Sequence, residues 1–192
     1  MTKETSTFAE PASLGLIGLA VAALVIGSGY LGLTSGTEKS LMVPWILFFG
    51  ATAQLIAGTT DIKRNNIFGG TVFNVYSMTM YSIALTLVIT NFTDVNFDIN
   101  HYAFGLIAIL VFSLIATVAS LMTNKTLFSI LVAVDLAVVL LIPHYINGFD
   151  SEPAGVFLIL TSILSFYAAA GILLNNMAGK TILPLGSAFI KK

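Results

Sequence analysis

One acidic residue stands apart from the other charges of the sequence. Asp135 lies near the middle of the apolar run 126–146, whereas the other acids and all Lys and Arg residues lie in polar segments or at helix ends. A carboxylate at the bilayer centre costs about 2.5 to 3.5 kcal/mol on insertion scales, so such residues usually face the protein interior or water. No Lys or Arg lies inside an apolar run to pair with it. Asp135 is therefore protonated, hydrated in a pore, or bound by hydroxyl and amide donors of neighbouring helices.

The residues alone leave three interpretations of Asp135 open. It couples transport to protons, it is a protonated group that holds helices together, or the apolar run is misplaced and Asp135 is interfacial. We treat it as the proton-coupling candidate.

Other polar residues form helical faces. Gln54 lies between Gly50 and Gly58 at spacings of four, so the three share one face, and the glycines let another helix approach closely. We interpret Gln54 and Gly58 as a helix-packing motif with one hydrogen bond between helices. The run 102–122 has a second polar face, for which we favour the same role, formed by Ser113, Thr117 and Ser120.

The run 68–90 has two opposed polar faces. Tyr76 lies about 200° around the helix from Asn74, so one pore cannot easily use both faces. The face opposite Tyr76 is a stripe of Thr71, Asn74, Ser77 and Tyr81.

The composition identifies the environment that positions these residues. Of the 192 residues, 57% are hydrophobic and 9% are charged, and the net charge is -1. A soluble domain carries about a quarter charged residues, so this pattern disfavours soluble enzymes and nucleic-acid binders. The sequence has no Cys, no metal-ligand cluster, no phosphate loop and no nucleophile–base pair. We therefore expect no enzyme activity, no cofactor and no metal.

Six apolar runs of about 20 residues predict an all-α membrane protein with six transmembrane helices. The runs are 14–33, 41–60, 68–90, 102–122, 126–146 and 153–174. They predict an N-terminal segment 1–13, a membrane domain 14–176 and a C-terminal tail 177–192.

The cations predict the orientation of the protein. Seven of them fall on one side of the membrane and Lys39 alone on the other. The positive-inside rule then places both termini in the cytoplasm. The seven are Lys3, Lys63, Arg64, Lys125, Lys180, Lys191 and Lys192.

Three motifs resemble one family. The first motif is formed by Glu10, Pro11, Ala12, Ser13, Leu14, Gly15 and Leu16. It resembles the N-P-A-P-L-G-L substrate-binding signature of the acetate uptake transporter family. This family includes succinate/acetate permeases and ammonia/acetate exporters. The block from Ala53 to Gly58, followed by Asp61, is similar to the family's A-Q-x-x-A-G-x-x-E. Residues 179–186 are similar to its G-[RK]-T-x-L-P-x-G.

The resemblance implies a six-helix protomer in a hexameric ring, with one pathway for small monocarboxylates in each protomer. A Phe, Tyr, Leu triplet narrows that pathway in relatives, and it falls on Leu19, Tyr76 and Val134 here. The changes to Leu19 and Val134 predict a wider or less aromatic constriction. The signature also departs from the family at Glu10 and Ser13, where relatives have Asn and Pro.

Charge and resemblance together predict the function. A carboxylate crossing the bilayer meets no cation, which favours moving a proton with it. We therefore expect proton-linked uptake of acetate, other small monocarboxylates and succinate by a homohexamer in the plasma membrane. Acetate and protons are then the partners. The alternative is a channel for a neutral solute such as urea or a short amide, and a scaffold without transport is disfavoured by the cost of Asp135.

Overall fold

The computed structural model describes residues 8–34 and 36–190. In this part of the chain, six helical spans are long and apolar enough to cross a membrane. The all-α, six-helix prediction is confirmed. The cations Lys3, Lys191 and Lys192, on which the orientation partly depends, lie outside the described residues.

Five of the spans are each one α-helix, and their ends lie within a few residues of the predicted ones. A short 3₁₀ turn, η3 (Ile99–His101), leads into the fourth span. The five helices are α1 (Ala12–Tyr30), α4 (Ile67–Phe92), α5 (Tyr102–Ser120), α6 (Lys125–Asn147) and α7 (Glu152–Ala178).

The remaining span, Lys39–Lys63, differs from the single helix expected over 41–60. It consists of η1 (Gly36–Leu41), α2 (Met42–Trp45), the π-helix η2 (Ile46–Ala53) and α3 (Gln54–Lys63). A π-helix bonds each N–H to the carbonyl five residues earlier, so its turns are wider than α-helical turns. The hydroxyl of Thr52 also reaches back five residues, donating to the Leu47 carbonyl at 2.9 Å.

Local sequence explains where several helices begin and end. The Asn66 side chain caps α4 by accepting from the Gly69 N–H at 3.3 Å, and Asn124 caps α6 in the same way. The glycines after α6 and α7, Gly148 and Gly179, have φ of 70° and 62°, the left-handed conformation that ends a helix.

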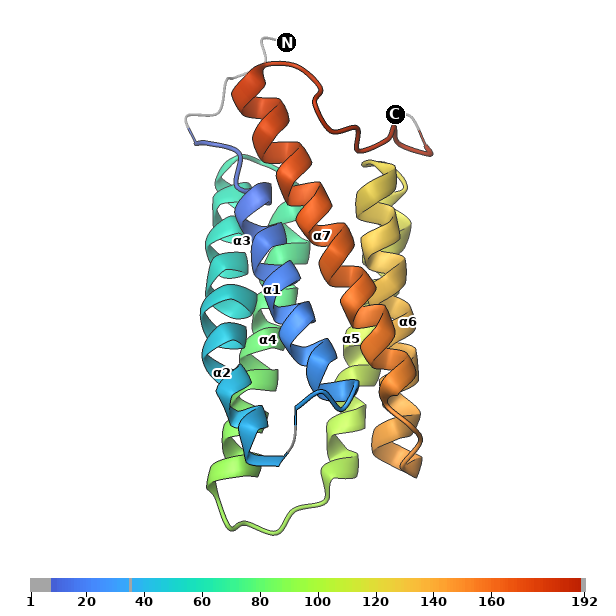
Figure 1. The fold of residues 1–192 in the computed structure, drawn as a ribbon. Coiled ribbons are helices and arrows are strands. Elements are labelled where there is room, and N and C mark those ends of the chain that lie inside the picture. Colours follow the sequence, from blue (N-terminus) through green and yellow to red (C-terminus); the bar gives the residue numbers. More distant parts are fainter. Residues whose placement is uncertain (1–7, 35, 191–192) are drawn as a thin grey trace.

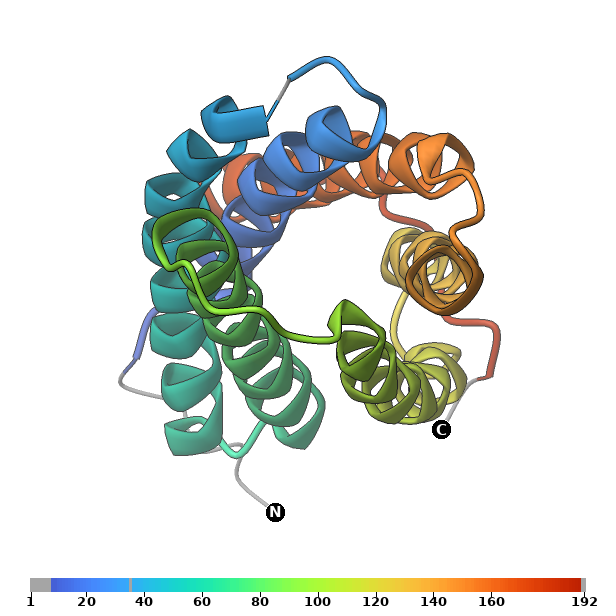
Figure 2. The ribbon, with the colours of Figure 1, turned by 90° about the horizontal axis from the view of Figure 1, so that it is seen from below.

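The helices surround a common axis, and α1 lies between the second span and α7 (Figure 2). α1 is the most buried of the six spans and α5 the least. Glycines allow the closest contacts of α1: a side chain at Gly27 would meet Gly155 of α7, and one at Gly18 would meet the Phe49 carbonyl of η2. These close contacts fix α1, which carries Leu19, against two neighbours.

The bundle has two ends, and the charges divide between them. We call the near end the one where α1 begins and α7 ends, and the far end the opposite one (Figure 1). Within the described residues, the near end carries Lys63, Arg64, Lys125 and Lys180, and the far end carries Lys39. Their placement follows the division that the sequence predicted.

Candidate functional site

Asp135 is buried in α6 and faces α5. The Ser113 hydroxyl donates to its Oδ1, and the Thr117 hydroxyl donates to Oδ2 at 2.6 Å. Ser113 Oγ also lies 2.7 Å from the Tyr76 phenol oxygen of α4. Hydroxyl donors from a neighbouring helix, one of the environments considered for Asp135, are present. A chain of hydrogen bonds therefore joins three helices, from Tyr76 through Ser113 to Asp135.

The three residues matched to the family constriction lie together. Leu19, Tyr76 and Val134 all line one cavity of about 70 Å³ in the middle of the bundle, which we call the central cavity. Leu19 and Tyr76 also line a cavity of about 80 Å³ toward the near end, the near cavity. Val134 lines the central cavity and not the near cavity. Leu19 and Tyr76 therefore separate two spaces along the axis.

A third space lies toward the far end. This far cavity, of about 110 Å³, shares four lining residues with the central cavity: Ile26, Tyr30, Ile83 and Tyr102. Lys39 and Tyr145 line it as well, and the phenol oxygens of Tyr30 and Tyr145 are 2.7 Å apart. Sequence reasoning did not find this tyrosine cluster, because its members come from three separate helices.

The near cavity contains an acid that sequence reasoning missed as a buried residue. Asp61 and Gln54 line this cavity, and neither residue is exposed to solvent. The sequence places Asp61 with the acids at helix ends, because it is close to Lys63 and Arg64. Its position seven residues after Gln54, two turns along one helix face, was the available signal.

Gln54 and Gly58 lie at a close helix contact. A side chain at Gly58 would come within 2.6 Å of Asn74 Nδ2 of α4, and Ser77 of α4 donates to the Ala51 carbonyl at 2.8 Å. The Gln54 Nε2 donates to the Gly50 carbonyl at 2.7 Å. Its expected hydrogen bond between helices is therefore corrected: it stays within its own span. Tyr76 faces the cavities from the other side of α4.

The signature residues do not gather around one point. Ala12 and Leu16 line the near cavity, while Gly15 lets α1 approach Phe73 and Leu14 is exposed. Pro11 is buried at the start of α1, and Ser13 is half-buried. Only part of the signature therefore borders the cavities.

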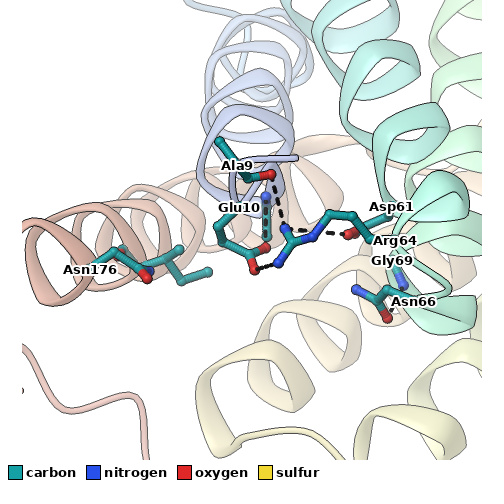
Figure 3. A network of polar contacts seen from close by, with 9 residues as sticks. Ala9, Glu10, Asp61, Arg64, Asn66, Gly69 and Asn176 are labelled. Atoms are coloured by element: carbon teal, nitrogen blue, oxygen red, sulfur yellow. Dashed lines mark hydrogen bonds and ion pairs between the residues drawn. The ribbon is translucent and has the colours of Figure 1, made fainter. Parts of the chain in front are cut away.

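Glu10 belongs to a charged network at the near end. The Arg64 guanidinium lies between Glu10 and Asp61 (Figure 3). It donates to Glu10 Oε2 at 2.7 Å and to the Ala9 carbonyl at 3.1 Å, while Nη1 is 4.0 Å from Asp61 Oδ1. Arg64 is thus hydrogen-bonded to the segment before α1 and only approaches Asp61.

Comparisons with known proteins place this chain among the relatives of transport proteins. The chain is 27% identical to acetate permease A of Emericella nidulans over 188 residues, which are 88% of this chain and 63% of that protein. It is 27% identical to the succinate-acetate/proton symporter SatP of Escherichia coli over 188 residues, 94% of this chain and 96% of that one. The chain spans about three fifths of the length of several fungal relatives.

A solved structure shares the fold. The structure of the bacterial acetate channel SatP superposes with a TM-score of 0.86 and 25% identity, covering 94% of this chain and 100% of that one. Residues 1–185 match the GPR1/FUN34/yaaH family. The chain belongs to the GPR1/FUN34/yaaH family.

Proposed function

We propose that this protein carries acetate and similarly small carboxylates, succinate included, across a membrane together with protons. The three cavities that share lining residues from the near end to the far end carry this proposal. The relatives named for acetate permeation and for succinate-acetate/proton symport support the substrate class.

The pathway we propose is narrowest at Leu19, Tyr76 and Val134. All three are nearly buried, with 6%, 3% and 7% of their surface exposed. Two of them are aliphatic, so Tyr76 has the one polar group among the three. A carboxylate passing this point can be recognised by the Tyr76 hydroxyl.

The hydrogen-bond chain gives Asp135 a way to control that hydroxyl. When Asp135 is ionised, Ser113 donates to it, and the Ser113 oxygen accepts from Tyr76, so the phenol proton is occupied. When Asp135 is protonated, it donates to Ser113, which donates to Tyr76. The Tyr76 O–H is then free to bind a carboxylate in the cavity. A proton on Asp135 thus prepares the constriction for the anion.

The charge distribution supports moving the proton and the anion together. In the described part of the chain, the Lys and Arg residues of the spans lie only at their ends. A bare anion would therefore cross the middle of the protein without a cation, whereas a proton taken up with it cancels the charge.

We further propose a homohexamer in the plasma membrane with both termini in the cytoplasm. The near end, with its cations, is then the cytoplasmic end. Residues 1–13 and 177–192, which precede and follow the membrane domain 14–176 in the sequence, would both be cytoplasmic segments.

Uptake into proteoliposomes tests the function. We expect labelled acetate to enter faster than into protein-free vesicles, and an imposed pH gradient to increase the initial rate. Asp135→Asn cannot titrate, but its amide can still donate to Ser113, so passive exchange should persist while the gradient-driven increase is lost.

Asp94→Asn is the matched control, because Asp94 is exposed in the loop after α4. It should behave like the parent protein. Labelled urea in the same vesicles tests the neutral-solute channel: urea flux that ignores pH, without acetate flux, would replace our proposal. If Asp135→Asn keeps the full gradient-driven rate, Asp135 is a packing residue.

A further inference from the structure

The near cavity holds buried acceptor atoms that no donor satisfies. Among the described residues, none donates a hydrogen bond to Asp61 Oδ1, Asp61 Oδ2 or Gln54 Oε1, and all three atoms are fully buried. The Gln54 amide cannot compensate, because its Nε2 is bound to the Gly50 carbonyl. Buried polar atoms are normally hydrogen-bonded, so unpaired acceptors beside a cavity indicate that something with donors binds there.

The nearby cation is held away from Asp61. Arg64 Nη1 approaches Asp61 Oδ1 to 4.0 Å, but its hydrogen bonds go to Glu10 and the Ala9 carbonyl. Among the described residues, the charged groups that face Asp61 are Arg64, which directly follows α3, and Glu10, which precedes α1. The Asn66 side chain, just before α4, approaches the carboxylate as an amide donor but not in hydrogen-bond geometry, and Gly69 of α4 also faces it. Neither residue titrates.

A carboxylate anion fits this cavity poorly as it stands. The anion brings acceptors only, and the unpaired atoms on the wall are also acceptors. One proton on Asp61 changes this, because a protonated carboxyl has an O–H donor and no charge. The same proton removes the cost of burying an ionised group without hydrogen bonds.

We propose that Asp61 is a proton-binding site of the near cavity, which takes up a proton when a carboxylate enters there, with Gln54 as the adjacent acceptor. This inference rests on the proposed transport of acetate and adds a second protonation site to Asp135. Gly69 leaves space for the Asp61 carboxylate, since a side chain at position 69 would occupy the space of Asp61 Oδ2.

Infrared difference spectroscopy of the full-length protein in lipid, with and without isotope-labelled acetate, tests the site. The wild-type protein should gain a protonated-carboxyl band on acetate addition that labelling of the acetate does not move. Asp61→Asn should lose this band, and Asp135→Asn should retain it. The exposed Asp94→Asn should match the wild type.

Two further variants keep the inference testable if Asp61→Asn does not fold. Removing the neighbouring cation with Arg64→Gln should move the midpoint of the band to higher pH, because the ionised carboxyl loses its counter-charge. Removing the negative charge of the Glu10 side chain with Glu10→Gln should move the midpoint of the band to lower pH. Shifts in one common direction, or none, would overturn the assignment.

The failures of the two proposals can be told apart. If the wild-type protein transports acetate but Asp61→Asn keeps the band unchanged, Asp61 is not the site and transport stands. If the wild-type protein moves no acetate in proteoliposomes, the proposed function fails whatever the spectra show.

Discussion

The two buried carboxylates of this protein have opposite hydrogen-bond environments. Asp135 receives a hydroxyl donor on each oxygen, whereas Asp61 receives none from the described residues. An unsatisfied buried acceptor costs about 1–3 kcal/mol, so the two groups respond differently to protonation. In our proposals, Asp135 acts through Ser113 on the constriction, and Asp61 acts directly on the near cavity. Two carboxylates would then serve two different steps of the proposed route.

At the scale of single residues, the constriction should select substrates by size. Leu19→Phe adds bulk between the near and central cavities. Overpacking costs about 1–3 kcal/mol, which corresponds to roughly 5- to 150-fold in rate. We expect the flux of a four-carbon acid such as butyrate to decrease by a factor in this range and the flux of acetate to decrease much less. Both are measured as initial rates in proteoliposomes.

A matched control for this substitution lies on the same helix. Leu24 is 45% exposed and does not border the near, central or far cavity. Leu24→Phe should leave both rates unchanged. Equal inhibition of acetate and butyrate by Leu19→Phe would argue against Leu19 as the size filter.

The sequence predicted some of these residues and missed others for physical reasons. Asp135 could be found because a lone acid in an apolar run is costly. Its donors Ser113 and Thr117 were visible as one helix face, but spacing along a helix does not reveal which helix that face meets. The burial of Asp61 was missed, since an acid three residues before Arg64 looks like an ordinary helix end, and its spacing of seven residues from Gln54 was the only sign of a shared face.

At the scale of elements, the π-helix is the main departure from prediction. The apolar runs fix the number of spans through length and hydropathy alone, and those six spans are present. A change from α to π hydrogen bonding over Ile46–Ala53 alters neither property, so composition carries no trace of it. The change ends directly before Gln54 and therefore sets the rotation of α3, which determines that Gln54 and Asp61 face the near cavity.

Close packing of α3 on α4 should depend on Gly58. An added methyl group would lie 2.6 Å from Asn74 Nδ2 and 2.8 Å from its backbone N, which cannot rotate away. Gly58→Ala should therefore destabilise the protein by about 1–3 kcal/mol through overpacking. Thermal unfolding in detergent, followed by circular dichroism, measures the effect.

Gly105 in α5 provides the comparison, because an added methyl group there has no neighbour within 4 Å. Gly105→Ala should leave the melting temperature unchanged or raise it, since Ala has the higher helix propensity. A parent-like melting temperature for Gly58→Ala would show that α3 and α4 can separate without cost.

At the scale of the whole molecule, position along the axis orders both charge and cavities. The near end carries Lys63, Arg64, Lys125 and Lys180, and the charged network of Glu10, Arg64 and Asp61 lies there too. The far end has Lys39 beside a cluster of tyrosines at the far cavity. The polar groups thus differ at the two ends of the row of cavities, so a solute that enters the proposed route from one end meets different side chains from one that enters at the other.

This asymmetry predicts that the near end is cytoplasmic, since cations are retained on that side. The native chain has no Cys, so single cysteines can be labelled without background. Lys63→Cys and Lys180→Cys are exposed near-end positions, and Asp94→Cys and Asp150→Cys are exposed far-end positions. In intact cells, a membrane-impermeant maleimide should label only the two far-end cysteines, and all four should react after the cells are permeabilised. Labelling of position 63 or 180 in intact cells would reverse the orientation and place Asp61 on the outer side.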